Sequence, residues 1–426
     1  MTTEKLANDA PVGDLEERVE RFFALDEDLL ADPWSLYAEL REQRPVMRVG
    51  PVVVVSRYDD IKAIFRDTTT FSNRRQNGSR VTQRRASLDA HELALYDDLI
   101  GHDTHHIGLN DPPDHTRLRR FVNQAFSPRA IEAMRGQVTE IAERLLDEID
   151  AEGQDPFDLG AFSFRLPFMV VCRMLEIPDI DVASFRAWAL AARRGLGTNY
   201  ENLHEAHEAV KHIEAYVLGL IQQRRAAGVS SIEGAGDDLV SNLLARDVDG
   251  THLSDAELVT MFTVMLTSGN ANDMISNAVI ALDAWPDQRR LLREQPELIR
   301  NAVEEFFRYC PSVHGVHRAV AADTEINGFA VRAGETVRLL VGSANHDPER
   351  FVDPDRLDIT RPDARRHVDF GFGIHVCLGQ WLSRLDIEVG LTALYARYPD
   401  LRVAGPFEYR REYNFRGPVR LMVSAR

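Results

Sequence analysis

Residues 370–379 read FGFGIHVCLG and place one cysteine, Cys377, among three glycines. Glycine reaches backbone conformations that other residues avoid, so this stretch predicts a tight loop whose backbone comes close to another group. A helical pattern, LGQWLSRLDIEVGLTALYARY, begins directly after the cysteine. The N–H groups and the dipole of a helix N-terminus favour a thiolate. The stretch therefore predicts a loop that presents one sulfur atom as a metal ligand or as a nucleophile.

The chain contains three cysteines, Cys172, Cys310 and Cys377, far apart in the sequence. An isolated cysteine is usually a small buried apolar residue, and we expect this of Cys172 and Cys310. A structural zinc site needs about four ligands, and no second cysteine lies near Cys377. The motif for covalent haem attachment, Cys-x-x-Cys-His, is absent. Two uses of Cys377 remain open: a catalytic pair with His375, or a haem iron held by a single thiolate.

The composition limits the possible partners and the compartment. The formal net charge of -17 disfavours nucleic acid and anionic membranes, because both attract positive charge. Three scattered cysteines disfavour a disulfide framework, which fits a reducing compartment. The first residues lack the apolar segment of a signal peptide, and no apolar run reaches the roughly 18 residues of a membrane span. We expect a soluble, cytoplasmic protein.

The pattern along the chain predicts a mainly α-helical protein with small β-sheets. Apolar residues recur at spacings of three and four over most of residues 112–310. Residues 51–56 and the C-terminal PVRLMVSAR predict strands, and 318–342 alternate around Asn327-Gly328, a hairpin signal. Residues 72–110 predict a long, partly helical loop. No linker divides the chain, so we expect a single domain over 1–426 with an N-terminal extension of about 25 residues.

The stretch FGFGIHVCLG resembles the haem-binding loop of the cytochrome P450 family, Phe-Gly-x-Gly-x-His-x-Cys-x-Gly, at every fixed position. The resemblance implies that Cys377 is the proximal ligand of haem b, whose iron-bound thiolate favours O–O cleavage. It implies that Phe370, Gly371 and Gly379 line the haem. It also implies the fold of that family, a triangular, helix-rich domain with a long central helix over the haem.

Other segments resemble the family in the same order along the chain. EEFFR contains Glu305 and Arg308, and FVDPDRLDITR contains Arg361; by resemblance these three residues form a structural network beside the haem loop. LNDPPDHTRLRRFV resembles the helix that contacts the haem. Anionic haem propionates need cationic or N–H donors. The resemblance assigns this role to His115, Arg119, Arg318 and His375.

Residues 255–285 form one long helical pattern that matches the family's central helix, and the pattern departs from the family at its centre. Gly269 stands where the family keeps a glycine beside bound oxygen. The usual acid and threonine are replaced by Ala271 and Asn272, and Asp273 follows one place late. Ala271 cannot relay a proton, whereas Asn272 can hydrogen-bond but cannot ionise.

This departure leaves several functions open. Monooxygenation of a small organic substrate is the first, by hydroxylation, epoxidation or O-dealkylation, with Asn272, ordered water or a polar substrate group in the proton path. A nitric oxide reductase, a peroxygenase or a phenol-coupling member of the family is the second. A haem sensor or carrier without turnover is an alternative of another class. A cysteine hydrolase that uses Cys377 and His375 is a further one.

The resemblance also implies substrate contacts and partners. The expected substrate-binding residues are Val264, Thr267, Ser268, Val313 and His314, with Val313 and His314 pointing over the haem. Their polar members suit a carboxylate, phenol or amide group. We expect a monomer that receives electrons from a ferredoxin or flavodoxin and its NAD(P)H-dependent reductase. Arg117, Arg120 and Arg384 are the expected docking cations for such an acidic partner.

Overall fold

The computed structural model describes residues 14–425 apart from 75–76, 178–181, 197–201, 228–238 and 268–272. The helices of the first half are α1 (Leu15–Phe23), α2 (Glu27–Ala31), α3 (Trp34–Gln43), α4 (Tyr58–Arg66), α5 (Ser79–Ala86), α6 (Ala90–Gly101), α7 (Asp114–Val122), α8 (Pro128–Ala133), α9 (Arg135–Glu152), α10 (Leu159–Met174) and α11 (Val182–Leu196). Those of the second half are α12 (Leu203–Ala226), α13 (Leu239–Ala245), α14 (Asp255–Thr267), α15 (Met274–Ala284), α16 (Pro286–Glu294), α17 (Ile299–Tyr309), α18 (Val341–Ala344) and α19 (Gln380–Arg397). The predicted mainly helical fold with small sheets is confirmed.

The largest sheet joins the two halves of the chain. Its strands are β1 (Val46–Val49), β2 (Val52–Val55), β3 (Phe71–Ser72), β5 (Val316–Val320) and β8 (Thr336–Leu339), in the order β1-β2-β8-β5-β3. Strand β2 pairs in parallel with β8, with Val52 opposite Thr336. Strand β5 pairs antiparallel with β8, with His317 opposite Arg338. The sheet thus brings the first 60 residues against the segment that precedes the cysteine loop.

Two smaller sheets lie elsewhere. Strands β4 (Phe157–Asp158), β10 (Met422–Ser424) and β9 (Arg402–Val403) form one, which includes the predicted C-terminal strand. Strands β6 (Thr324–Ile326) and β7 (Phe329–Val331) form the predicted hairpin. Asn327 and Gly328 occupy its turn with φ of 49° and 79°, the left-handed conformation that a two-residue hairpin turn requires.

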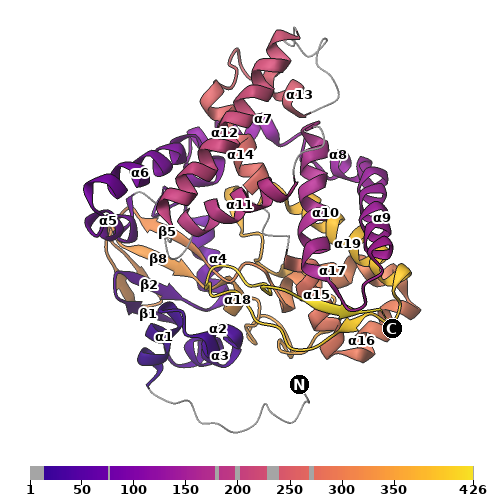
Figure 1. Ribbon diagram of the computed structural model, residues 1–426. Helices are drawn as coiled ribbons and strands as arrows, with labels where there is room; N and C mark the ends of the chain where they lie inside the picture. The colour runs from indigo at the N-terminus through magenta and orange to yellow at the C-terminus, as the bar shows by residue number, and fades with distance from the viewer. Residues whose placement is uncertain are drawn as a thin grey trace.

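The elements form a broad triangle (Figure 1), with the large sheet and α1–α3 on one side and α9, α10 and α19 on the other. Helices α11, α12 and α14 cross between them. The long predicted helix over 255–285 is present as α14 and α15, and residues 268–272 between them lie outside the described residues. The predicted loop over 72–110 contains α5 and α6. Helix α1 belongs to the predicted N-terminal extension and packs against α3. The ring of Phe22 in α1 lies 5.8 Å from that of Tyr37 in α3.

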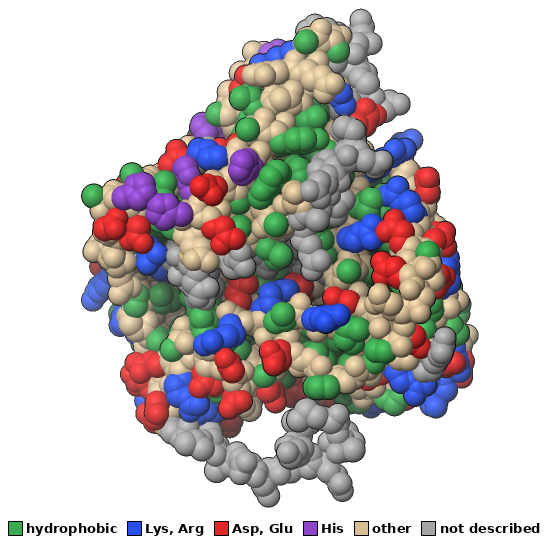
Figure 2. All heavy atoms as spheres, in the orientation of Figure 1, with side chains coloured by type: hydrophobic (Ala, Val, Ile, Leu, Met, Phe, Trp, Pro, Cys, Tyr) green, Lys and Arg blue, Asp and Glu red, His purple; other side chains and the backbone are tan. Residues whose placement is uncertain are grey.

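Helices α6 and α12 contact each other beside the large sheet. The rings of His91 and His204 lie 4.8 Å apart, and His207 Nε2 lies 2.9 Å from the Asp98 carboxylate. Histidine side chains gather over these two helices in Figure 2, where acidic and basic side chains are otherwise interspersed. Of the helices in the described part of the chain, none combines the length and the apolar character needed to cross a membrane.

Helix α19, which follows the cysteine loop, is held in the centre of the main core by a close approach at Gly390. A Cβ at this position would lie 2.8 Å from Ile275 Cδ1 and 2.9 Å from Leu166 Cδ2. Both neighbours are fully buried, on α15 and α10. Because a packed core resists added volume, only glycine allows the three helices to meet here.

We therefore expect Gly390→Val to destabilise the protein by roughly 1–3 kcal/mol, the usual cost of overpacking a core. Denaturant unfolding of the purified protein measures this. Gly219→Val is the matched control, because Gly219 also lies inside a long helix and nothing lies within 4 Å of its Cβ position. Equal losses in the two variants would contradict a role for the close approach.

Candidate active site

The loop that carries Cys377 is built on glycines with positive φ. Gly371 and Gly373 have φ of 71° and 76°, a region that other residues rarely adopt. A Cβ on Gly373 would lie 3.0 Å from the carbonyl oxygen of Phe65, so this glycine also lets the loop lie against α4. The Cys377 N–H donates to the Phe370 carbonyl at 2.9 Å and closes the loop. Helix α19 begins three residues later.

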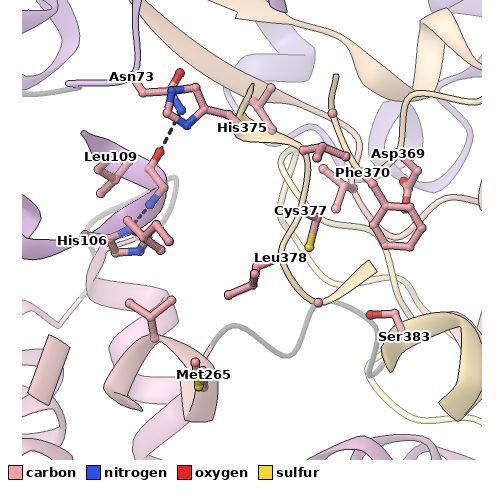
Figure 3. A pocket seen from close by; sticks show the side chains of 18 of the residues that line it. Asn73, His106, Leu109, Met265, Asp369, Phe370, His375, Cys377, Leu378 and Ser383 are labelled. Carbon is pink, nitrogen blue, oxygen red and sulfur yellow. Dashed lines mark hydrogen bonds between the residues drawn. The ribbon is translucent and has the colours of Figure 1, made fainter. Parts of the chain in front are cut away.

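Cys377 opens into a cavity of about 620 Å³. In Figure 3, Cys377 and Phe370 lie on one side of this space, Met265 of α14 lies on another, and His106 and Leu109 lie on a third. Burial raises the pKa of the Cys377 thiol, while the Gly379 N–H and the Arg119 guanidinium lower it. The lining includes apolar side chains from four helices, namely Phe168, Val171, Leu239, Met261, Val264, Met265 and Leu382.

Four cationic or histidine side chains line one part of this cavity: His115 and Arg119 of α7, Arg318 of β5, and His375 of the loop. The rings of His115 and His375 lie 4.1 Å apart. Their four ring nitrogens are buried and have no hydrogen-bond partner among the described residues. Burial lowers the pKa of both histidines, that of His375 to about 3, and it lowers the pKa of Arg318 to about 10.

Unpartnered buried polar atoms are costly, so this group of side chains suits a ligand that carries acceptor oxygens. Haem b meets the requirement, because its two carboxylates can accept from the four side chains while its iron meets one sulfur atom. Phe370, Gly371 and Gly379 also line the cavity. The residues predicted as cofactor contacts are therefore brought together, and they fit this cofactor.

Behind the loop, Glu305 binds two arginines in a region without solvent. Arg308 donates from Nε and Nη2 to the Glu305 carboxylate at 2.7 and 2.8 Å, and both side chains are 0% exposed. Arg361 donates from Nε to Glu305 Oε1 at 3.1 Å. The other guanidinium N–H groups of Arg308 and Arg361 donate to backbone carbonyls between residues 345 and 356. The structure brings the three predicted residues into one network.

The neighbouring Glu304 has a role that the sequence analysis missed. Its carboxylate accepts from Arg384 Nε at 2.9 Å and lies 3.2 Å from His367 Nε2. Arg384 in turn lies over the Phe370 ring, 4.5 Å from its centroid. Burial raises the pKa of Glu304, but the hydrogen bonds from His367 and Arg384 outweigh it and hold the pKa at about 2. Arg384, expected as a docking residue, is thus engaged within the chain.

Only some of the predicted substrate contacts that the structure describes line the cavity. Val264 and Val313 line the cavity. Thr267 donates its hydroxyl to the Thr263 carbonyl at 2.8 Å and is not part of the lining. Ser268 and the predicted catalytic residues Gly269, Ala271 and Asn272 lie outside the described residues.

The expectation that His314 points over the haem is wrong. Its Nδ1 lies 3.1 Å from the Tyr37 hydroxyl, and its ring lies 5.3 Å from that of Trp34. The chain is extended here, with a bridge between Val313 and Phe415 and with the His314 N–H donating to the Asn414 carbonyl. Successive side chains of an extended segment point to opposite sides, so Val313 faces the cavity and His314 faces the N-terminal helices.

Asp273, the acid one place late in the sequence, is held by an ion pair. Arg410 donates from Nη1 to Asp273 Oδ1 at 3.0 Å, and its Nη2 contacts the second carboxylate oxygen. A Cβ on Gly417 would lie 2.3 Å from the Asp273 carboxyl carbon, so the C-terminal segment covers this side chain. Asp273 does not line the cavity.

Two buried carboxyl groups of the cavity wall, Asp369 and Asp386, carried no signal in the sequence. Both line the cavity, and one carboxylate oxygen of each has no hydrogen-bond partner among the described residues. Burial raises the pKa of Asp369 to about 8 and that of Asp386 well above its ordinary value. Side chains that are buried only by the tertiary fold cannot be recognised from local sequence.

Comparisons with known proteins agree with this site. The family model for cytochrome P450 matches residues 291–399. The polyketide biosynthesis cytochrome P450 PksS of Bacillus subtilis is 32% identical over 409 residues, 92% of this chain and 96% of the relative. The 6-deoxyerythronolide B hydroxylase of Saccharopolyspora erythraea is 34% identical over 404 residues, with the same shares of 92% and 96%. The solved structure of PksS superposes with a TM-score of 0.81 at 31% identity and covers 94% of this chain and 98% of its own.

The fold and the comparisons define the class of protein as a haem monooxygenase. The chain belongs to the cytochrome P450 family, and its cofactor is haem b. The prediction of family, fold class, cofactor and enzyme class is confirmed.

The Glu304 pair predicts a specific loss of stability in acid. In the folded protein the pKa of Glu304 is about 2, below the ordinary value near 4.3. The ionised carboxylate therefore adds its full contribution to the free energy of unfolding above about pH 4.3, and this contribution is lost as the pH falls toward 2. Between pH 7 and pH 4 the loss is about 0.6 kcal/mol. Denaturant unfolding of wild type and Glu304→Gln at both pH values tests this. The free-energy difference between the two proteins must shrink at pH 4; a constant difference would contradict the assignment.

Proposed function

We propose that this monooxygenase inserts one oxygen atom of O₂ into a small, largely apolar organic molecule that lies between Cys377 and α14. The observation that carries the proposal is one sulfur atom facing an apolar cavity whose cofactor contacts lie together. When bound, haem supplies the binding and activation of oxygen, and a cysteine ligand favours O–O cleavage. In this proposal His115, Arg119, Arg318 and His375 hold the haem carboxylates, and Cys377 ligates the iron.

The chain's own residues have two tasks beside this ligation. The hydrogen bond from Cys377 N–H to Phe370 O closes the loop. The loop thereby keeps the Cys377 sulfur directed into the cavity. The apolar side chains from α10 and α14 exclude water from the reacting region. A dry cavity strengthens the electrostatic contacts within it.

The sequence departs from the family at the positions that usually carry the acid and the threonine of the proton path. Ala271 has no titratable group, and Asp273 is paired with Arg410 outside the cavity lining. We infer that the amide of Asn272 hydrogen-bonds to ordered water or to a polar group of the substrate, and that these groups pass the protons that oxygen activation needs.

The relatives indicate a substrate class. Their names describe a vitamin D(3) 25-hydroxylase, a 6-deoxyerythronolide B hydroxylase and a mycinamicin IV hydroxylase/epoxidase. A solved neighbour at 28% identity was crystallised with testosterone. We therefore propose that the substrate is a bulky apolar molecule of secondary metabolism. Hydroxylases and epoxidases among the relatives favour monooxygenation over nitric oxide reduction, peroxide use, phenol coupling or a non-catalytic haem carrier.

A hydrolase is also disfavoured. Cys377 and His375 are both described, and no hydrogen bond joins the sulfur to a ring nitrogen of His375. A nucleophilic cysteine needs a base within hydrogen-bond reach.

Bacterial members of the family receive electrons from ferredoxin and reductase partners. We propose such a partner for this chain, acting in the cytoplasm as a monomer. Two of the expected docking cations are occupied, because Arg117 pairs with Glu257 and Arg120 with Asp249. Lys62 and Arg66 are better candidates for an acidic partner. Each lies 4.8 Å from the centroid of the Phe372 ring in the cysteine loop, and within the described chain neither forms an ion pair.

Cys377→Ala tests the assignment of the iron ligand. We expect the reduced, carbon monoxide-bound variant to lose the red-shifted absorption of thiolate-ligated haem, because no other described cysteine lines the cavity. Cys172→Ala is the control and should keep that absorption, since Cys172 packs against the main core. An unchanged spectrum of Cys377→Ala would refute the assignment.

Asn272→Thr tests the proton path. A threonine restores the usual hydroxyl, so we expect a change in the amount of product formed per electron consumed. Product yield and NAD(P)H consumption are measured together with a saturating substrate and a surrogate ferredoxin pair. Unchanged coupling would mean that Asn272 takes no part in the proton path.

A further inference from the structure

A second group of basic side chains lies at the wall of the cavity, apart from the four assigned to the haem carboxylates; two of its members line the cavity and the third lies behind them. It consists of Arg80 of α5, His317 of β5 and Arg338 of β8, and is called the Arg80 cluster below. Arg80 Nη1 and Arg338 Nη1 lie 3.0 and 2.8 Å from the same atom, His317 Nε2. Guanidinium groups only donate, so Nε2 is the acceptor and the imidazole is neutral. Two positive charges thus converge on one uncharged ring.

The strand geometry separates this cluster from the cofactor contacts. His317 and Arg338 are direct cross-strand partners in the antiparallel pair of β5 and β8, so their side chains share one face of the sheet. Arg318 is the next residue along β5, and its side chain points to the opposite face. It lies over the ring of Phe65, 5.1 Å from the centroid. A haem carboxylate held by Arg318 therefore lies on the other face of the sheet from the Arg80 cluster.

Arg338 is 1% exposed, and it forms no ion pair with a carboxylate of the described residues. Its other contacts are the Tyr413 carbonyl, which accepts from Nη2 at 2.9 Å, and the faces of the Tyr413 and Phe23 rings. Burial lowers its pKa to about 10, and Glu412 acts on its charge only through a longer-range electrostatic interaction, which raises the pKa of Arg338. A buried cation without a carboxylate is destabilising unless an anion comes near.

Arg338 does not line the cavity itself, but it lies next to Gly315, which does. Gly315 lines the cavity, and a Cβ there would lie 2.6 Å from Arg338 Nη2, so the guanidinium sits directly behind the glycine backbone. Arg80 and His317 line the cavity themselves, together with Thr336. The backbone N–H of Arg80 donates to Thr336 Oγ1 at 3.3 Å, which fixes the start of α5 to the sheet. Contacts within the fold therefore hold the Arg80 cluster in place at the cavity wall.

We propose that the Arg80 cluster binds an anionic end of the substrate, a carboxylate or a phosphate. The proposal rests on the function above, because it requires the substrate to lie in this cavity. Arg80 makes the direct contact, and His317 and Arg338 position it and add to the positive potential. The anchored end lies on the sheet side of the cavity, so the apolar remainder of the molecule extends toward Cys377. The distance from the anion to the oxidised carbon then selects the site of reaction.

Binding of a matched set of probes to the holoenzyme tests this. Decanoate and decyl phosphate carry the anion, and decan-1-ol has the same chain without the charge. Isothermal calorimetry gives the Kd of each for wild type, Arg80→Gln, Arg80→Lys and Arg85→Gln. Arg85 is the matched control, because it lies on the same helix, is exposed and pairs with Asp97 instead.

We expect Arg80→Gln to raise the Kd of at least one anion about tenfold or more, as for the loss of one charge-assisted hydrogen bond. The Kd of decan-1-ol should change less than about twofold, Arg80→Lys should restore part of the anion affinity, and Arg85→Gln should match wild type. If Arg80→Gln weakens the binding of decyl phosphate alone or of decanoate alone, the affected probe identifies the anion. Equal losses for anions and alcohol, no loss, or a changed haem spectrum in the ligand-free variant would overturn the proposal. An intact carbon monoxide spectrum with no anion effect would leave the proposed monooxygenase function standing.

Discussion

The buried carboxylate of Glu305 is the interaction on which the rest of the site depends. It lies in a region with no solvent and accepts hydrogen bonds from Arg308 and Arg361, which come from segments more than 50 residues apart. Removing Glu305 would leave two buried guanidinium groups without their carboxylate, which is far more costly than losing an exposed ion pair. The remaining guanidinium N–H groups are satisfied by backbone carbonyls of residues 345–356. The segment before the cysteine loop is therefore closed onto α17 at one defined position.

The adjacent residue extends this arrangement to the other side of the loop. Glu304 holds Arg384 of α19, and Arg384 covers the ring of Phe370. Two successive residues of one helix thus hold the polypeptide that leads into the loop and the helix that leaves it. Between these anchors, positive φ values at Gly371 and Gly373 turn the chain so that Cys377 faces the cavity. Rigid support of this kind is what keeps a single metal ligand in place.

The large sheet divides the positive charge of the site between two faces. Arg318 and the histidines near it suit the carboxylates of the cofactor, while Arg338 and His317, on the opposite face, are combined with Arg80 from α5. The same strand β5 supplies a member of each group because side chains alternate along a strand. The pairing of Asp273 with Arg410 keeps the acid that follows Asn272 in the sequence out of the cavity lining.

Much of this protein could be predicted from its sequence. The glycine-rich stretch around Cys377 predicted a tight loop from its local signature, and its resemblance to the motif of a known family predicted the family and the cofactor. The helical periodicity established the fold class, and Asn327-Gly328 established the hairpin. The regular spacing of residues 255–285 did not reveal the state of Asp273, because its partner Arg410 lies 137 residues away. Local patterns report on elements, and contacts across long separations leave no mark in them.

The sequence by itself thus determined a mainly helical, haem-binding protein of the cytochrome P450 family with one cysteine in a glycine-rich loop. Only the tertiary structure decided which side chains share the cavity with it. It directed His314 toward Tyr37 and away from the cavity, occupied Arg117, Arg120 and Arg384 with internal carboxylates, and buried Asp369 and Asp386 in the wall. It also placed Arg80 beside Arg338, 258 positions later in the chain. The physical reason is that charge and burial depend on neighbours in space, and those neighbours are set by sheet register and helix packing.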